Sequence, residues 1–110
     1  MRMTTGIDLM NRLSAKVAEK RDSLKSIGAI YKFALEGDGG LTFVVDLKND
    51  LIVKEGDGPA ECTIRMSVPD AADLFEGRAN GQALFFTGKL RIEGDMGLAL
   101  RLQSLTDILK

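Results

Sequence analysis

The chain has 110 residues, of which 45% are hydrophobic and 28% charged, and its formal net charge is −1. This balance indicates one globular domain and argues against a disordered chain, and no apolar run approaches the ~20 residues that cross a bilayer. The polar start of the chain lacks the apolar stretch of a secretory signal, so we expect an intracellular, cytoplasmic protein.

The absence of histidine restricts the chemistry that the chain can perform, and Cys62 is the single cysteine. Ser–His and Cys–His nucleophiles, the commonest general base and the usual zinc ligand sets are therefore excluded. One cysteine also excludes an internal disulfide and agrees with a reducing compartment. We expect no catalytic residue, no metal, no cofactor and no enzyme activity. A pI near 5.4, with aromatic residues not interleaved with basic ones, argues against nucleic acid.

The basic residues are concentrated at the start of the chain. Residues 1–32 hold seven Lys or Arg and three acidic side chains, a balance of +4, and the remainder balances to −5. Thr5 can cap a helix here, and the apolar residues of that helix, which recur at helical spacing, are Ile7, Met10, Leu13, Val17, Leu24 and Ile27. Lys16 and Lys20 lie off this stripe. Transient contact with an anionic membrane and a simply solvated helix face are both open readings.

After Gly28 the apolar pattern changes to a period of two, which is typical of strands. In "AIYKFALEG" and "LTFVVDLK" alternate residues share a face, and the intervening "EGDGG" has the glycines of a hairpin turn. "LIVKEG" and "ECTIRMSV" are a third and a fourth strand. Cys62 belongs to the apolar face of the fourth, where a thiol is usually inert. Four consecutive strands at short spacing predict an antiparallel meander.

The second half of the chain returns to helices. Ser67 or Val68 can cap a helix that Gly77 ends, a short helix follows at about 81–86, "KLRIEG" is a fifth strand, and Asp95 caps a last helix to about residue 109. We therefore predict one α+β domain, residues 1–110, with helices covering one face of a five-stranded, mostly antiparallel sheet.

Acidic motifs in the chain have simpler explanations than chemistry. The triplet Glu-Gly-Asp occurs three times, but no segment has the alternating ligands of a calcium loop, so turns and caps explain it. Asp70 and Asp73, with Glu76 nearby, fit a solvated helix start better than an acid–base pair.

The last third of the chain carries more apolar surface than one sheet contact requires. In the final helix, Leu98, Leu102, Leu105 and Leu109 form one stripe, and Met96, Leu100 and Gln103 form a second row beside it. Phe85 and Phe86 are adjacent, so they point about 100° apart on a helix. The second row and one phenylalanine either complete a core wedged between two elements or face a cavity. Adaptable Met66 and Met96 suit a cavity.

A family resemblance bears on this choice. "FFTGKLRIEGDMGLALRLQSL", preceded by Gln82, resembles the C-terminal half of the sterol carrier protein 2 family, in which a Phe-Phe-Ser/Thr-Gly-Lys/Arg-Leu run precedes a leucine-rich helix. "GLTFVVDLKN" and "ECTIRMSVPDAADLFEGRAN" are similar to that family's second strand and to its fourth strand with the following helix. The resemblance spans roughly Leu9 to Ile108.

The resemblance implies a hydrophobic tunnel between sheet and helices for fatty acids, fatty acyl-CoA, sterols or phospholipids, and no catalysis. Gln82 and Gln103 match glutamines that lie near the polar part of the ligand in similar proteins. The chain ends in Ile108, Leu109 and Lys110, not in the Ser-Lys-Leu-like tripeptide of peroxisomal members, so we expect a cytosolic one. The residues predicted to bind lipid are Phe33, Ile64, Met66, Phe75, Gln82, Phe85, Phe86, Met96, Leu100 and Gln103.

We therefore predict a non-enzymatic protein that binds or transfers lipid. The alternative is an accessory or scaffold domain for an enzyme of lipid or quinone metabolism.

Overall fold

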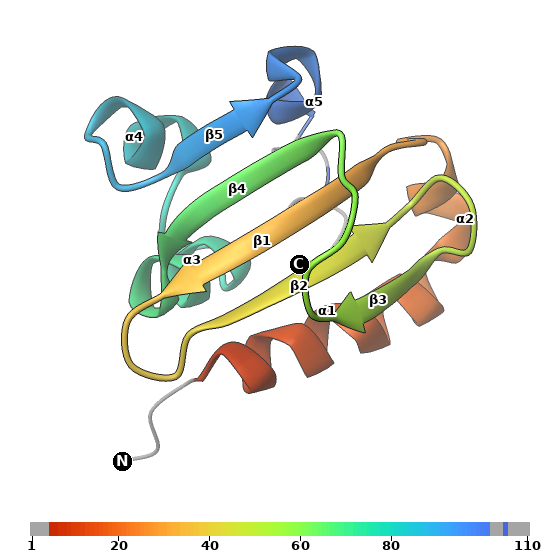
Figure 1. Ribbon diagram of the computed structural model, residues 1–110, viewed down its shortest axis with the longest axis horizontal. Helices are drawn as coiled ribbons and strands as arrows, with labels where there is room; N and C mark the ends of the chain where they lie inside the picture. The colour runs from red at the N-terminus through yellow and green to blue at the C-terminus, as the bar shows by residue number, and fades with distance from the viewer. Residues whose placement is uncertain (1–4, 102–104, 106–110) are drawn as a thin grey trace.

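A five-stranded sheet with helices packed against one face forms the body of the protein (Figure 1). The computed structural model describes residues 5–101 and 105. In chain order its elements are α1 (Gly6–Glu19), α2 (Arg21–Lys25), β1 (Ile30–Glu36), β2 (Leu41–Asp46), β3 (Ile52–Glu55), β4 (Cys62–Ser67), α3 (Val68–Phe75), α4 (Gly81–Phe86), β5 (Arg91–Gly94) and α5 (Met96–Leu100). The predicted α+β class is confirmed.

The first helix begins at the predicted cap. The Thr5 hydroxyl accepts a hydrogen bond from the backbone N–H of Asp8, and the Asp8 carboxylate accepts one from the backbone N–H of Thr5. Its buried stripe is Leu9, Leu13 and Val17. The prediction that Ile7 belongs to this stripe is wrong: it is two residues before Leu9, about 200° around the helix, and is exposed.

The predicted N-terminal helix is divided into α1 and α2, which the periodicity of its apolar residues does not predict. Lys20 leaves the helical conformation with φ −115° and ψ 31°, so α1 ends there and the short α2 follows. Leu24 of α2 and Ile27, which follows this helix, are both buried in the core.

The strand order is β3-β2-β1-β4-β5, which corrects the predicted meander. β1 and β4 are parallel, with Phe33 beside Ile64, whereas the other three pairings are antiparallel. The sheet is therefore mostly antiparallel, as predicted, but mixed. The physical reason is the connection formed by residues 56–61, which crosses the open face of the sheet instead of turning back beside β3 (Figure 1). There Lys32 pairs with Asp57 at 2.6 Å, and Gly58 lies against Val44.

The core lies between the sheet and the helices. α1 packs against β2 and β3, α3 against β1 and β4, and α5 against β4 and β5. At its centre the rings of Phe33 and Phe43 stack with centroids 5.4 Å apart, and Phe75 meets Phe33 edge-on at 5.9 Å. Most of the alternating strand residues predicted to point inward are buried: Tyr31, Phe33, Leu35, Phe43, Val45, Leu47, Cys62, Ile64, Met66 and Val68. Leu41, which is predicted to share this face, is half-buried. Each large side chain buried here stabilises the fold by roughly 1.5–3 kcal/mol.

The last helix is described only in part. Leu105 is buried in the core, which agrees with the predicted stripe, whereas Leu102, Leu109 and Gln103 lie outside the described residues. Among residues 5–101 and 105, no helix combines the length and the apolar character that a membrane span requires.

Gly94 ends β5 where the backbone requires glycine. Its φ is +99°, and a Cβ at this position would lie 2.6 Å from the carbonyl oxygen of Glu61. We therefore expect Gly94→Ala to lower the free energy of unfolding by about 1–3 kcal/mol or more, as measured by urea denaturation. Gly58→Ala is the matched control, because an added Cβ there meets only Val44 at an ordinary 3.5 Å. Equal stabilities of the two variants would contradict this account.

Candidate functional site

A groove of about 300 Å³ opens at the β5 edge of the sheet. Its described lining is Leu74 from α3, Asn80 before α4, Gly81, Gln82, Phe85 and Phe86 from α4, Leu90 before β5, Ile92 from β5, and Met96, Ala99 and Leu100 from α5. No charged side chain is among these residues, and the polar ones are two amides. The groove therefore suits an apolar ligand with at most a small polar group beside the amides.

Short-range hydrogen bonds hold the α4 wall. The side-chain oxygen of Asn80 accepts from the backbone N–H groups of Gln82 at 2.8 Å and Ala83 at 3.3 Å, which caps the helix. Leu84 is the buried residue of this six-residue helix, so Phe85 and Phe86 are turned away from the core. The two rings meet edge-on, with centroids 5.8 Å apart.

The α5 wall is held by its cap and by one bond to the central strand. Asp95 accepts from the backbone N–H groups of Gly97 at 2.8 Å and Leu98 at 3.3 Å, as the predicted cap requires. The buried hydroxyl of Tyr31 donates to the carbonyl of Leu98 at 2.7 Å. This bond spans 67 positions of the chain and fixes α5 relative to β1.

The groove is buried at its floor and exposed at its mouth. Leu74 and Leu90 are almost completely buried. Toward solvent, by contrast, Phe86 is 80% exposed, Leu100 78%, Met96 52% and Phe85 39%. A site of this kind has a buried apolar floor and exposed apolar side chains that a ligand or another surface can cover.

Of the residues predicted to bind lipid, Gln82, Phe85, Phe86, Met96 and Leu100 come together in this groove. Phe33, Ile64 and Met66 lie in the core and Phe75 lines another cavity, while Gln103 lies outside the described residues. For all ten, contact with lipid stays a prediction.

Sequence reasoning missed the floor and the polar end of the groove. Leu90 and Ile92 alternate in the fifth strand and so share a face, a signal that could have included them. Leu74 and Asn80 carry no such signal, because α3 and the connection after it reach the groove only through the tertiary fold.

A second, smaller cavity of about 210 Å³ lies between α1 and α3 and is lined by Arg12, Leu13, Ala15, Lys16 and Phe75. Lys16 lies 3.8 Å from Glu19, one turn along its own helix. Membrane contact through Lys16 and Lys20 stays a prediction.

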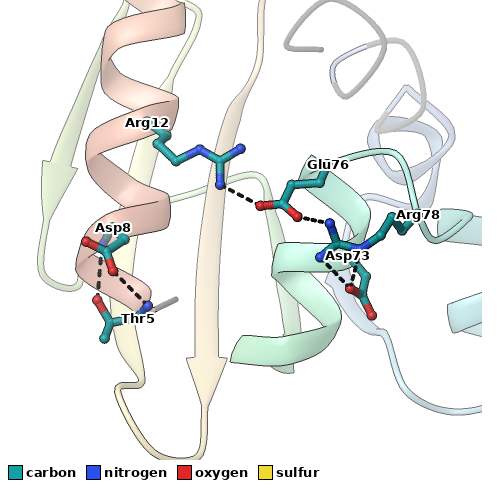
Figure 2. A network of polar contacts seen from close by, with 6 residues as sticks. All are labelled: Thr5, Asp8, Arg12, Asp73, Glu76 and Arg78. Carbon is teal, nitrogen blue, oxygen red and sulfur yellow. Dashed lines mark hydrogen bonds and ion pairs between the residues drawn. The ribbon is translucent and has the colours of Figure 1, made fainter. Parts of the chain in front are cut away.

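An ion-pair network joins α1 to the end of α3 (Figure 2). Arg12 of α1 lies 3.0 Å from Glu76, Glu76 also pairs with Arg78, and Arg78 lies 2.9 Å from Asp73. Arg78 stands two residues before Asn80, so the network fixes the chain that leads into the α4 wall. Hydrogen bonds from Arg12 and then from Arg78 lower the pKa of Glu76.

The described side chains that could carry out chemistry do not form a reactive site. Cys62 is fully buried, and burial raises the pKa of its thiol, which keeps it protonated and unreactive. Within residues 5–101 and 105, no three His, Cys, Asp or Glu side chains are grouped so as to hold a metal ion.

The five-stranded sheet with helices on one face, together with the apolar groove at its β5 edge, defines the class as a small α+β domain with an apolar groove. The chain belongs to the SCP-2 sterol transfer family, whose model matches residues 10–107.

Curated relatives of the chain are much longer proteins. It is 45% identical over 92 residues to sterol carrier protein 2 of Rattus norvegicus, a match that covers 79% of this chain and 17% of the relative. It is 34% identical over 92 residues to hydroxysteroid dehydrogenase-like protein 2 of Danio rerio, covering 81% of this chain and 22% of the relative. The chain thus spans about a fifth of the length of these relatives.

Solved structures share the fold. Sterol carrier protein 2 from Yarrowia lipolytica, in its apo form, aligns with a TM-score of 0.80 and 28% identity over 93% of this chain and 89% of that one. Sterol carrier protein 2 from Aedes aegypti in complex with palmitate aligns with a TM-score of 0.73 over 100% of both chains, and at 23% identity it shows the fold alone.

The Tyr31 hydroxyl offers a direct probe of the α5 attachment, because the chain has one tyrosine. Burial, with a smaller effect of Cys62, raises its pKa to about 12. The corresponding stability is present below the unfolded value of 10.0 and is lost as the pH rises toward about 12. We expect tyrosinate absorbance to stay low at pH 10.0 in the native protein and to be half-developed there in urea. Native titration near the unfolded value, with the fold intact, would contradict the burial of this hydroxyl.

The ion-pair network of Glu76 predicts that the stability of the fold decreases in acid. Because the pKa of Glu76 is lowered in the folded state, its contribution to stability is present above its ordinary value of 4.5 and is lost as the pH falls through the folded value. We expect Glu76→Gln to lower the urea midpoint at neutral pH and to differ less from the native protein in acid. Asp38→Asn is the control, since Asp38 has no ion pair among the described side chains. An equal effect of the two variants at every pH would contradict the network.

Proposed function

We propose that the chain is a non-enzymatic, intracellular lipid-binding domain that takes the acyl chain of a fatty acid or fatty acyl-CoA into the groove between α4, β5 and α5. The observation that carries this proposal is the groove itself, with its uncharged lining and its buried floor at Leu74 and Leu90. Its volume of about 300 Å³ is at the lower end for sites that enclose small molecules, which favours one acyl chain over a bulky ring system.

The lining of the groove also favours one orientation of the bound lipid. A carboxylate buried among uncharged residues would be costly, so the acyl chain occupies the floor and the polar group stays at the solvent-exposed mouth. Gln82 is exposed on the α4 wall, where its amide can donate to a carboxylate or thioester oxygen. Gln82 therefore orients the ligand, and the phenylalanines and Leu100 cover its chain.

The family description and one solved structure of the same fold both support this proposal. The family is described as one of sterol transfer, and the Aedes aegypti structure of the same fold holds a C16 fatty acid. Sterol remains a second ligand class for the same groove. The predicted enclosed tunnel would extend this groove toward Phe33, Ile64 and Met66 of the core.

A second candidate function is that of an accessory domain for an enzyme. It is favoured by the length of the relatives, of which this chain spans about a fifth and which include a hydroxysteroid dehydrogenase-like protein. In that role the domain would bind a separate catalytic unit, and its groove would be small or unused. A groove that stays empty in native mass spectrometry would favour this second role.

Displacement of a fluorescent fatty acid in solution tests the proposal. Affinity should rise by about fourfold per added methylene, the equivalent of about 0.8 kcal/mol, until the groove is filled. Leu100→Arg should lower it by roughly tenfold, because a charge then borders the acyl chain. Leu100 is largely exposed, so the fold should tolerate the change.

Ile52→Arg is the matched control, since Ile52 is an exposed apolar residue of β3 at the opposite edge of the sheet. No displacement by any chain length, or equal losses in both variants, would overturn the assignment of the groove.

A further inference from the structure

The helix α4 is the least firmly packed element of the described structure. Among the described helices and strands, it is the one that makes no extensive contact with another element. Its one buried side chain is Leu84, and in Figure 1 it lies at the β5 edge of the sheet, clear of α1 and α3. Segments held by few buried contacts open at a low cost in free energy. The α4 wall is therefore the part of the groove that can move.

A glycine with positive φ stands on each side of α4. Gly77 precedes the helix with φ +80°, and Gly88 follows it with φ +77°. A Cβ added at Gly88 would have no neighbouring heavy atom within 4 Å, so the backbone there lies in open space. Glycine accepts backbone rotation at little steric cost, and a hinge consists of a few residues that absorb such rotation. Both connections can therefore turn while α4 stays helical.

Arg78 joins the two sides of the Gly77 turn. Its guanidinium lies 2.9 Å from the carboxylate of Asp73 and also pairs with Glu76, and both acids stand at the C-terminal end of α3 (Figure 2). Carboxylates are unfavourable at this end of a helix dipole, and the last turn of α3 has no basic residue of its own. Arg78 compensates these charges by folding back over the turn, so it holds the start of the α4 wall on α3.

We propose that α4 is a flap over the groove, hinged at Gly77 and Gly88, and that Arg78 is the latch that holds the flap on the body. The inference rests on the proposed function, since it describes how a lipid enters and leaves the same groove. At about 300 Å³ the groove is at the lower end for sites that enclose small molecules, so entry of an acyl chain requires a wall to move. A surface ion pair changes an equilibrium by at most about fivefold, which is weak enough for a latch that opens.

The flap also accounts for the exposed apolar side chains on the two walls. Phe86 of α4 and Leu100 of α5 both line the groove, and both are largely exposed. When the flap closes over an acyl chain, these side chains cover the chain and lose contact with water, which favours the closed, lipid-bound state. The latch then determines how often the empty groove opens.

Hydrogen exchange of the lipid-free protein, followed by mass spectrometry, tests the latch without a ligand. The marker amides are those of Lys89 and Leu90, which donate to the carbonyl of Leu84 at 2.9 and 3.0 Å across the Gly88 hinge. We expect Arg78→Gln to speed their exchange by about two- to fivefold, because the flap opens more often. Amides of β1 and β2 should exchange as in the native protein. Arg78→Lys keeps the positive charge and should restore most of the protection.

Stopped-flow measurement with a fluorescent fatty acid relates the flap to the groove. Arg78→Gln should raise the association and release rates together by about two- to fivefold and change Kd less than about twofold, because the latch acts on opening and not on contacts with the lipid. Arg12→Gln is the matched control. Arg12 lies 3.0 Å from the same Glu76 carboxylate, but it belongs to α1 and does not cross the Gly77 turn, so both rates should stay within about twofold of the native values.

Three results would overturn the proposal. Unchanged exchange of the marker amides in Arg78→Gln would mean that Arg78 holds no flap. Equally faster exchange in β1 and β2 would mean a general loss of stability. Faster exchange at the markers with unchanged release would mean that lipid leaves by another route. If no fatty acid binds at all, the proposed function fails, whereas exchange in the lipid-free protein still decides whether Arg78 holds α4.

Discussion

The parallel pairing of β1 with β4 is the constraint on which the rest of the structure depends. Because residues 56–61 carry the chain across the open face, β4 joins the sheet beside β1 and everything that follows is built on that side. α3 therefore covers β1 and β4, and β5 becomes the edge strand opposite β3. A meander would have placed β4 beside β3, against the helix α1, where no separate wall for a groove would remain.

The groove follows from the small size of the elements on that side. β5 has four residues, α4 has six and the described part of α5 has five. Each of these short elements can bury a single row of side chains. Leu84 and Leu90 are used in this way to attach the wall to the core. Among residues 5–101 and 105, the neighbouring phenylalanines and Leu100 are left largely exposed. The apolar surplus that is visible in the sequence is therefore a direct consequence of short helices at a sheet edge.

Local sequence patterns predict the caps and the inward faces of the strands, but they do not predict which distant segments come together. Caps at Thr5, Ser67 and Asp95 involve neighbours within three residues, and all three side chains accept the expected backbone N–H groups. Period-two alternation assigns the inward faces of the strands correctly, but it cannot tell whether Phe33 meets a helix or a cavity, because both lie on the same face. The parallel register and the floor at Leu74 depend on where distant segments cross, for which no local pattern exists.

The two walls of the groove are held by backbone groups, and this separates stability from ligand contact. Asn80 and Asp95 cap their helices through backbone N–H groups, and Tyr31 holds the Leu98 carbonyl. Because none of these bonds involves the side chains of Phe86 or Leu100, both residues can change with little loss of folding free energy. The fold therefore does not require their hydrophobic character, whereas the proposed lipid contact does.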